Sequence, residues 1–164
     1  MSQVPPTDRF QALDACHQQI QIHLEQLADV LLKIEAGEDE AAYREQAGTI
    51  ERFFSGISRQ HHADEEKNVF PALLASDNPE LVHAVRTLQQ DHGWIEQNWI
   101  ELAPMLSAIA QGEDWVHMEE FKHTIEVYLA LSHDHIVLEE TLIYPEAKSR
   151  FADELAARAA RAVA

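Results

Sequence analysis

Apolar residues recur three and four positions apart in four long stretches of the chain, at positions 10–34, 50–73, 81–109 and 118–142. This spacing is typical of helices that bury one face. Only short segments separate the stretches, so consecutive helices should pack as antiparallel neighbours. The pattern therefore predicts an all-α fold, an up-down-up-down four-helix bundle.

Residues near the helix ends refine this prediction. Pro104 is expected to kink the third helix, Asp114 to cap the fourth, and Pro145 to end its regular part. The C-terminal residues are rich in Ala and Arg. We expect a single domain, with a bundle over residues 1–148 and a short helical tail over residues 149–164.

Polar residues interrupt all four apolar faces. His17 lies in the stripe of the first helix and His92 in that of the third. A spacing of four residues places a His and a Glu on one helix face, about one turn apart. Such pairs occur in the second helix, as His61 with Glu65, and in the fourth, as His135 with Glu139.

These polar positions belong to an internal repeat. The motif His-x3-Glu-Glu-x2, followed by an apolar residue, an aromatic residue and Pro, spans residues 61–71 and again 135–145. The motif Leu-x3-His-x2-Ile around His17 returns around His92. A repeat of this kind predicts two halves packed about a pseudo-twofold axis, where the polar residues of all four helices would meet.

Glutamates on an inner face need a positive partner, because an unpaired buried carboxylate costs several kcal/mol. No arginine falls in the inner stripes near Glu65 or Glu139. A pair of metal ions would satisfy both carboxylates, with neutral imidazoles completing the coordination. Mixed imidazole and carboxylate ligands suit iron and manganese and can also hold zinc.

Composition narrows the possible partners and location. The net charge of -17, from 29 acidic and 12 basic side chains, would repel nucleic acid and anionic membrane surfaces. No apolar run is long enough for a membrane span, and no targeting segment is evident at the N-terminus. Cys16 is the single cysteine, so an internal disulfide is excluded. A cytoplasmic protein is the default expectation.

The motifs resemble those of the hemerythrin-like, or HHE cation-binding, family over residues 10–146. In that family a His comes from the first helix, His-x3-Glu from the second, His with a further ligand four residues on from the third, and His with a carboxylate from the fourth. The resemblance implies two iron ions joined by an oxo or hydroxo group and by carboxylates, with zinc or manganese as alternatives. The ligands it implies are His17, His61, Glu65, His92, Glu96, His135 and Glu139.

The resemblance also implies how these ligands divide. One iron would take His92, Glu96 and His135, the other would take His17 and His61, and Glu65 and Glu139 would bridge. Two positions depart from the oxygen-carrying hemerythrins, which have a His where this chain has Glu96 and an Asp, at a five-residue step, where it has Glu139. An anionic oxygen in place of an imidazole stabilises ferric iron. Reversible oxygen carriage is therefore expected to be less favoured than sensing, iron handling or peroxide chemistry.

Several nearby residues have open roles. Ile95, not Glu96, continues the apolar stripe, so Glu96 could instead face water. Glu66 and Glu140 lie about 100° around the helix from the ligand glutamates and could hydrogen-bond to a ligand or face water. Tyr144 could donate a hydrogen bond near the site. The remaining histidines are expected at the surface, namely His62, His133, His23, His83, His117 and His123. Of these, His62 and His133 could also assist the site from outside the ligand set.

Three functions remain open at this stage. The first is a non-catalytic di-iron protein that binds oxygen, nitric oxide or iron as carrier, store or sensor, with a diatomic molecule or peroxide as ligand and a homodimer as one assembly. The second is a di-iron oxidoreductase acting on peroxide or oxygen, for which no catalytic residue can be named. The third is a metal-free acidic bundle that binds another protein.

Overall fold

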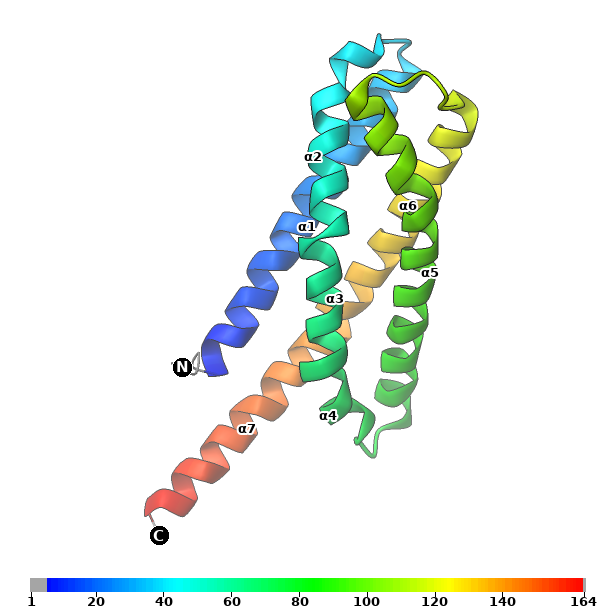
Figure 1. The fold of residues 1–164 in the computed structure, drawn as a ribbon. Coiled ribbons are helices and arrows are strands. Elements are labelled where there is room, and N and C mark those ends of the chain that lie inside the picture. The colour runs from blue at the N-terminus through cyan, green and yellow to red at the C-terminus, as the bar shows by residue number, and fades with distance from the viewer. Residues whose placement is uncertain (1–5, 164) are drawn as a thin grey trace.

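The structure, a computed structural model, describes residues 6–163 and confirms the predicted all-α fold (Figure 1). No strand occurs among these residues, and none of their helices is both long and apolar enough to cross a membrane. The elements are α1 (Pro6–Glu35), the 3-10 turn η1 (Glu40–Ala42), α2 (Arg44–Ser55), α3 (Ile57–Asn68), α4 (Phe70–Leu74), α5 (Pro79–Gln111), α6 (Met118–Leu138), the π-helical segment η2 (Glu139–Ile143) and α7 (Tyr144–Val163).

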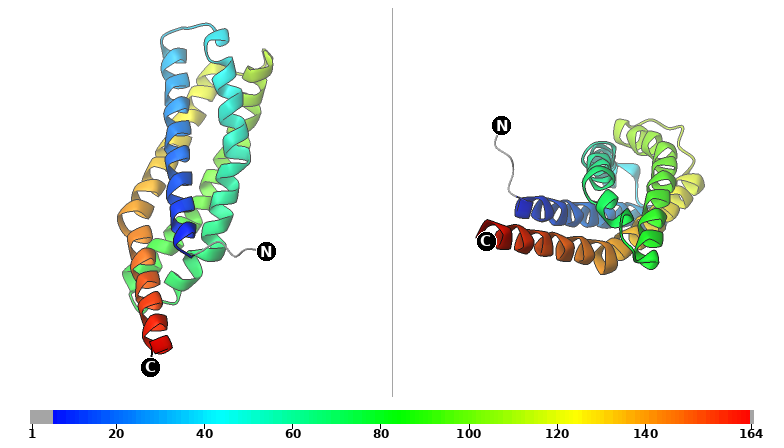
Figure 2. Two further views of the ribbon diagram at one scale, coloured as in Figure 1. Left: turned by 90° about the vertical axis from the view of Figure 1, so that its left-hand side faces the viewer. Right: turned by 90° about the horizontal axis from the view of Figure 1, so that it is seen from below.

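Consecutive long segments of the bundle run in opposite directions (Figure 1). α1 packs against α2 and α6, and α5 packs against the same two helices, so the four segments enclose one interior. α5 continues through Pro104 to Gln111. Figure 2 shows α7 running past the start of α1 and continuing beyond it, and the rings of Phe10 and Phe151 lie 5.6 Å apart.

The second segment is not one helix. It breaks at Gly56, between α2 and α3, and again at Val69, between α3 and α4. The first break turns Ile57 outward, where 58% of its surface is exposed. Ile57, an apolar residue of the stretch 50–73 that was predicted to bury one face, therefore does not lie on that face, while His61 and Glu65, further along α3, remain buried.

The fourth segment differs from its prediction at both ends. α6 begins at Met118, with His117 rather than Asp114 at the N-cap. Pro145 does not end the helix, because α7 continues from η2 to Val163. A proline ring clashes with the carbonyl four residues earlier in a regular α-helix, and the wider π turn just before Pro145 relieves that conflict.

The π turn also changes which side chains face the interior. Its extra residue shifts the helical phase, so that Ile143 is buried while Leu142 is 38% exposed. For this reason Leu142, the last residue of the predicted apolar stretch 118–142, does not extend the buried face. Glu139, at the start of the turn, is fully buried.

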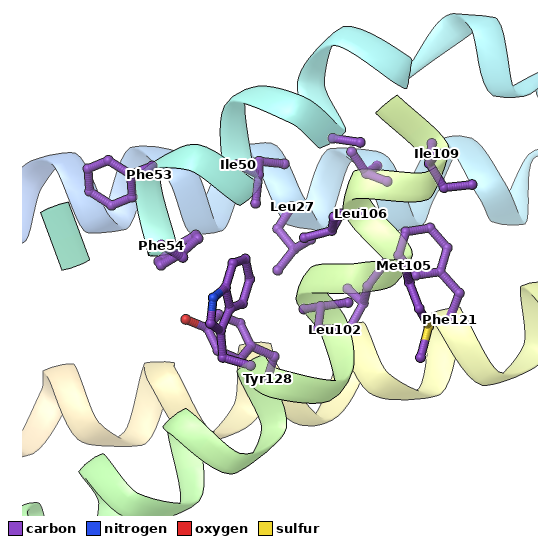
Figure 3. Packing of buried hydrophobic residues seen from close by; sticks show 14 of the residues in the cluster. Leu27, Ile50, Phe53, Phe54, Leu102, Met105, Leu106, Ile109, Phe121 and Tyr128 are labelled. Carbon is purple, nitrogen blue, oxygen red and sulfur yellow. The ribbon is translucent and has the colours of Figure 1, made fainter. Parts of the chain in front are cut away.

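Two apolar cores lie one above the other in the bundle. The larger core fills the end near η1, where Leu27, Ile50, Leu106 and Phe121 point toward one another (Figure 3). The smaller core fills the end near α4 and includes Phe70. The buried histidines and glutamates lie between these two cores. The apolar side chains on either side hold them away from bulk water.

Two leucines of α1 test the larger core. Leu27 is fully buried, whereas Leu32, on the same helix, is 63% exposed. Leu27→Ala should lower the free energy of unfolding by about 2–5 kcal/mol, because it leaves a cavity. Leu32→Ala should change it by less than about 1 kcal/mol. Urea denaturation followed by circular dichroism measures both, and equal effects would contradict the described packing.

Candidate metal centre

A buried polar cluster lies between the two apolar cores. His17 comes from α1, His61 and Glu65 from α3, His135 from α6 and Glu139 from η2, and each is at most 3% exposed. His92 of α5 is partly buried beside them. The structure thus brings together six of the seven ligand residues that the sequence indicated.

Each glutamate reaches a histidine of both halves. Glu139 contacts His17 through Oε2, 2.6 Å from Nε2, and His135 through Oε1. Glu65 places Oε1 3.2 Å from Nε2 of His61 and 3.7 Å from Nε2 of His92. Both carboxylates are therefore placed to span two cation positions.

The two halves of the cluster match closely. The rings of His17 and His61 lie 4.9 Å apart, and those of His92 and His135 lie 4.7 Å apart. Since His17 pairs with His92 and His61 with His135 in the repeat, this agreement is what a pseudo-twofold axis through the cluster would produce.

Outer carboxylates face the far sides of the imidazole rings. Nδ1 of His92 lies 2.8 Å from Glu66, and Nδ1 of His17 lies 3.5 Å from the equivalent Glu140. Both glutamates also keep partial contact with solvent. Each therefore combines the two roles that the sequence left open, contact with a ligand histidine and contact with water. A carboxylate at the outer nitrogen orients a metal-binding imidazole and leaves the inner nitrogen free to bind.

Glu96 lies outside this cluster, contrary to the prediction. Its two carboxylate oxygens accept hydrogen bonds from Arg59 of α3, and its side chain is 45% exposed. The ion pair holds Glu96 on the outer side of α5. The expected role of Glu96 as a ligand beside His92 therefore has no support in the geometry.

His62 occupies the place that Glu96 was expected to fill. Its ring stacks on His92 with centroids 4.3 Å apart and meets His135 at 5.6 Å. The expectation that His62 lies on the surface is wrong, because the side of α3 about 100° from His61 faces the second half of the cluster. The adjacent His61-His62 pair was the sequence signal for this residue.

The donor atoms form two groups, each compact enough to surround one cation. The first group is His17, His61, Glu65 and Glu139, and the second is His62, Glu65, His92 and His135. Within the described chain, the buried Oε1 atoms of Glu65 and Glu139 contact the imidazole nitrogens of His61 and His135 and have no hydrogen-bond donor apart from those rings. Carboxylate oxygens next to imidazole nitrogens, with no other donor, fit metal cations.

Without a metal, protons would take the place of the cations. Burial alone would lower the pKa of His61, but hydrogen bonds with Cys16 and Glu65 raise it to about 10. Burial likewise opposes the shift in His135, where Asp91 and Glu139 raise the pKa to about 9. The two protonated imidazoles would neutralise the two carboxylates, so metal uptake must displace protons.

His62 differs from those two histidines. Burial and the neighbouring His92 lower its pKa well below the ordinary value. A neutral imidazole keeps its lone pair available for a cation. His62 can therefore bind a metal without first losing a proton, unlike His61 and His135.

A small cavity of about 10 Å³ adjoins the cluster. Four histidines and Glu139 line one side of it. A cavity of this size holds about one water-sized molecule. The remaining wall consists of apolar and hydroxyl side chains, namely Ile20, Phe54, Ile95, Ile136, Ser58, Tyr128 and Ser132.

Comparison with known proteins agrees with this geometry. Residues 8–160 match the model of the hemerythrin HHE cation binding domain. An uncharacterised protein of Haemophilus influenzae is 26% identical over 133 residues, which cover 81% of this chain and 75% of that protein.

The raised histidine pKa values predict how pH changes the stability of the metal-free protein. A group whose pKa is raised by folding stabilises the folded state below its unfolded pKa, and that contribution is lost as the pH rises through the folded pKa. For His61 and His135 the loss should extend from the ordinary value of 6.5 up to about 9–10. Urea unfolding at pH 7 and pH 9.5 should show lower stability at the higher pH.

Two controls assign this effect to the cluster. The alkaline loss should shrink in His61→Gln and persist in His133→Gln, since His133 is exposed and outside both donor groups. It should also shrink after Zn²⁺ is added, because bound metal replaces the protons. A metal-free protein equally stable at both pH values would contradict the assignment.

Proposed function

The chain belongs to the hemerythrin HHE cation-binding family, and on that premise we propose that it is a non-heme di-iron protein that binds oxygen, nitric oxide or iron itself as carrier, store or sensor. The two donor groups that share Glu65 carry this proposal. A carboxylate common to both groups is the arrangement expected when two cations lie side by side.

The donor set favours iron or manganese over a structural zinc ion. Imidazole and carboxylate together suit iron and manganese, whereas a structural zinc site usually contains thiolates. His17 and His61 would hold one ion, and His62, His92 and His135 the other, with Glu65 and Glu139 between them. When bound, the iron pair supplies a redox-active position for a small ligand, and the chain orients the imidazoles and excludes water.

His62 changes the expected balance between ferrous and ferric iron. With a neutral imidazole in place of Glu96, the ligand set carries one negative charge fewer than the sequence indicated. A less anionic set stabilises ferric iron less strongly. The ligand set with His62 therefore supports reversible binding of oxygen or nitric oxide better than the set with Glu96 would.

The cavity limits what can reach the centre. Its volume of about 10 Å³ has room for about one water-sized molecule, which favours a small ligand over an organic substrate. This size favours ligand binding over oxidation of a larger molecule. A metal-free interaction module would need protons on His61 and His135 to neutralise the two buried carboxylates.

Metal content tests the ligand assignment through a matched pair of variants. The wild-type chain, purified without added chelator, should contain about two iron ions, as in other carboxylate-bridged bundles. His62→Ala should lower the content by removing one donor of the second group. Glu96→Ala should leave it unchanged, because Glu96 pairs with Arg59 instead. Wild-type protein without metal, even after reconstitution with Fe²⁺, would overturn the proposal.

Nitric oxide tests the use of the cavity. The ferrous protein should form a nitrosyl complex visible by absorption spectroscopy. Ser132→Val, which adds volume to the cavity wall, should weaken nitric oxide binding while the iron content stays constant. Ser149→Val on exposed α7 is the matched control and should bind like wild type. Iron-loaded protein that binds neither nitric oxide nor oxygen would exclude the small-ligand role and leave iron storage.

A further inference from the structure

Next to the cluster, the two copies of the repeat have different aromatic residues at the same place, a tyrosine in one and a phenylalanine in the other. Tyr144 follows Glu139 by five positions, and Phe70 follows Glu65 by five positions. Tyr144 stacks on His17 with centroids 4.6 Å apart, and Phe70 stacks on His92 with centroids 5.6 Å apart. The two rings therefore play the same packing role, and the hydroxyl of Tyr144 has no counterpart in the other half.

That hydroxyl reaches into the cluster. It donates a hydrogen bond to Oε2 of Glu65 at 3.1 Å and lies 3.2 Å from Nε2 of His61. Tyr144 is only 3% exposed, so water cannot readily replace it. The bond engages one oxygen of Glu65 and directs the other, Oε1, between His61 and His92.

Glu139 is held differently from Glu65. Its two oxygens contact His17 and His135, and Phe70, which stands where a tyrosine would match Tyr144, has no donor to offer. The two carboxylates that would bridge the metal ions thus differ in their surroundings. Glu65 accepts the 3.1 Å hydrogen bond from the phenol hydroxyl, whereas the closest contacts of Glu139 are with imidazoles, although the phenol also lies near Glu139.

We propose that Tyr144 is a positioning residue that makes the two cation positions unequal, strengthening the one formed by His17 and His61. This inference rests on the proposed metal centre. The hydroxyl fixes the rotation of Glu65 and lies beside the inner nitrogen of His61, so its effect falls mainly on the first donor group. An outer hydrogen bond to a metal ligand typically contributes about 10-fold to 100-fold in metal affinity.

The two binding steps are measured with Zn²⁺, which has no redox chemistry of its own. The metal-free full-length chain is titrated in the presence of a chromophoric chelator that competes for Zn²⁺. His17→Ala removes a donor of the first group and His92→Ala removes one of the second, so these two variants identify which step belongs to which half.

Tyr144→Phe should weaken the first-half step by about 10-fold or more and change the second-half step much less. The variant copies the residue that already stands at position 70, so the ring packing is retained. A purely structural role would instead weaken both steps equally, in parallel with lower stability of the metal-free protein. Equal loss in both steps, or no loss in either, overturns the inference.

A double variant moves the hydroxyl from one half to the other. In Tyr144→Phe combined with Phe70→Tyr, the stronger step should shift to the half that contains His92. If the double variant still binds its tighter Zn²⁺ ion in the half that contains His17, the inference is contradicted. This result decides the matter even if the single variant folds poorly. Wild-type protein that binds no Zn²⁺ and no iron would overturn the metal centre as well, whereas two bound ions with unaltered steps would overturn only the role of Tyr144.

Discussion

Two carboxylates buried between apolar cores require positive charge nearby, and the rest of the site depends on that requirement. Glu65 and Glu139 are fully buried, and each has an oxygen whose possible donors are imidazole nitrogens. Protons on His61 and His135 can neutralise them, and so can metal ions held by the same nitrogens. The cluster is therefore poised between a protonated and a metal-bound state, and binding a cation must release protons.

The surrounding helices are irregular where they supply these residues. α3 lies between breaks at Gly56 and Val69, and Glu139 begins a π turn. Prolines at equivalent places in the two halves, Pro71 and Pro145, favour such departures, because neither can donate a backbone hydrogen bond. The result is that both glutamates point inward, although the helices that carry them deviate from ideal geometry in different ways.

Near-symmetry produces two groups of candidate metal donors, and a few unmatched residues make the two groups different. His62 adds an imidazole to the second half, and Tyr144 adds a hydroxyl to the first. Cys16 beside His61 stands where Asp91 faces His135 in the other half. Differences of this kind would allow two ions to be held with unequal strength next to the cavity, which donors of both groups line.

The sequence alone determined the helical class, the inward stripes and the six residues that meet in the interior, because helical periodicity and the repeat are local properties of the chain. It did not reveal that Glu96 turns to Arg59, since that ion pair joins residues 37 positions apart on different helices. Nor did it reveal that His62 faces inward, because the direction of a residue 100° from the main stripe depends on where the neighbouring helices lie. The phase shifts at Gly56 and in the π turn, which expose Ile57 and Leu142, likewise arise from packing and proline geometry that a regular period does not contain. Tertiary structure thus decided that His62, and not Glu96, lies beside His92 in the interior. Contacts between distant helices, which residue spacing along the chain does not contain, determine which of these side chains points inward.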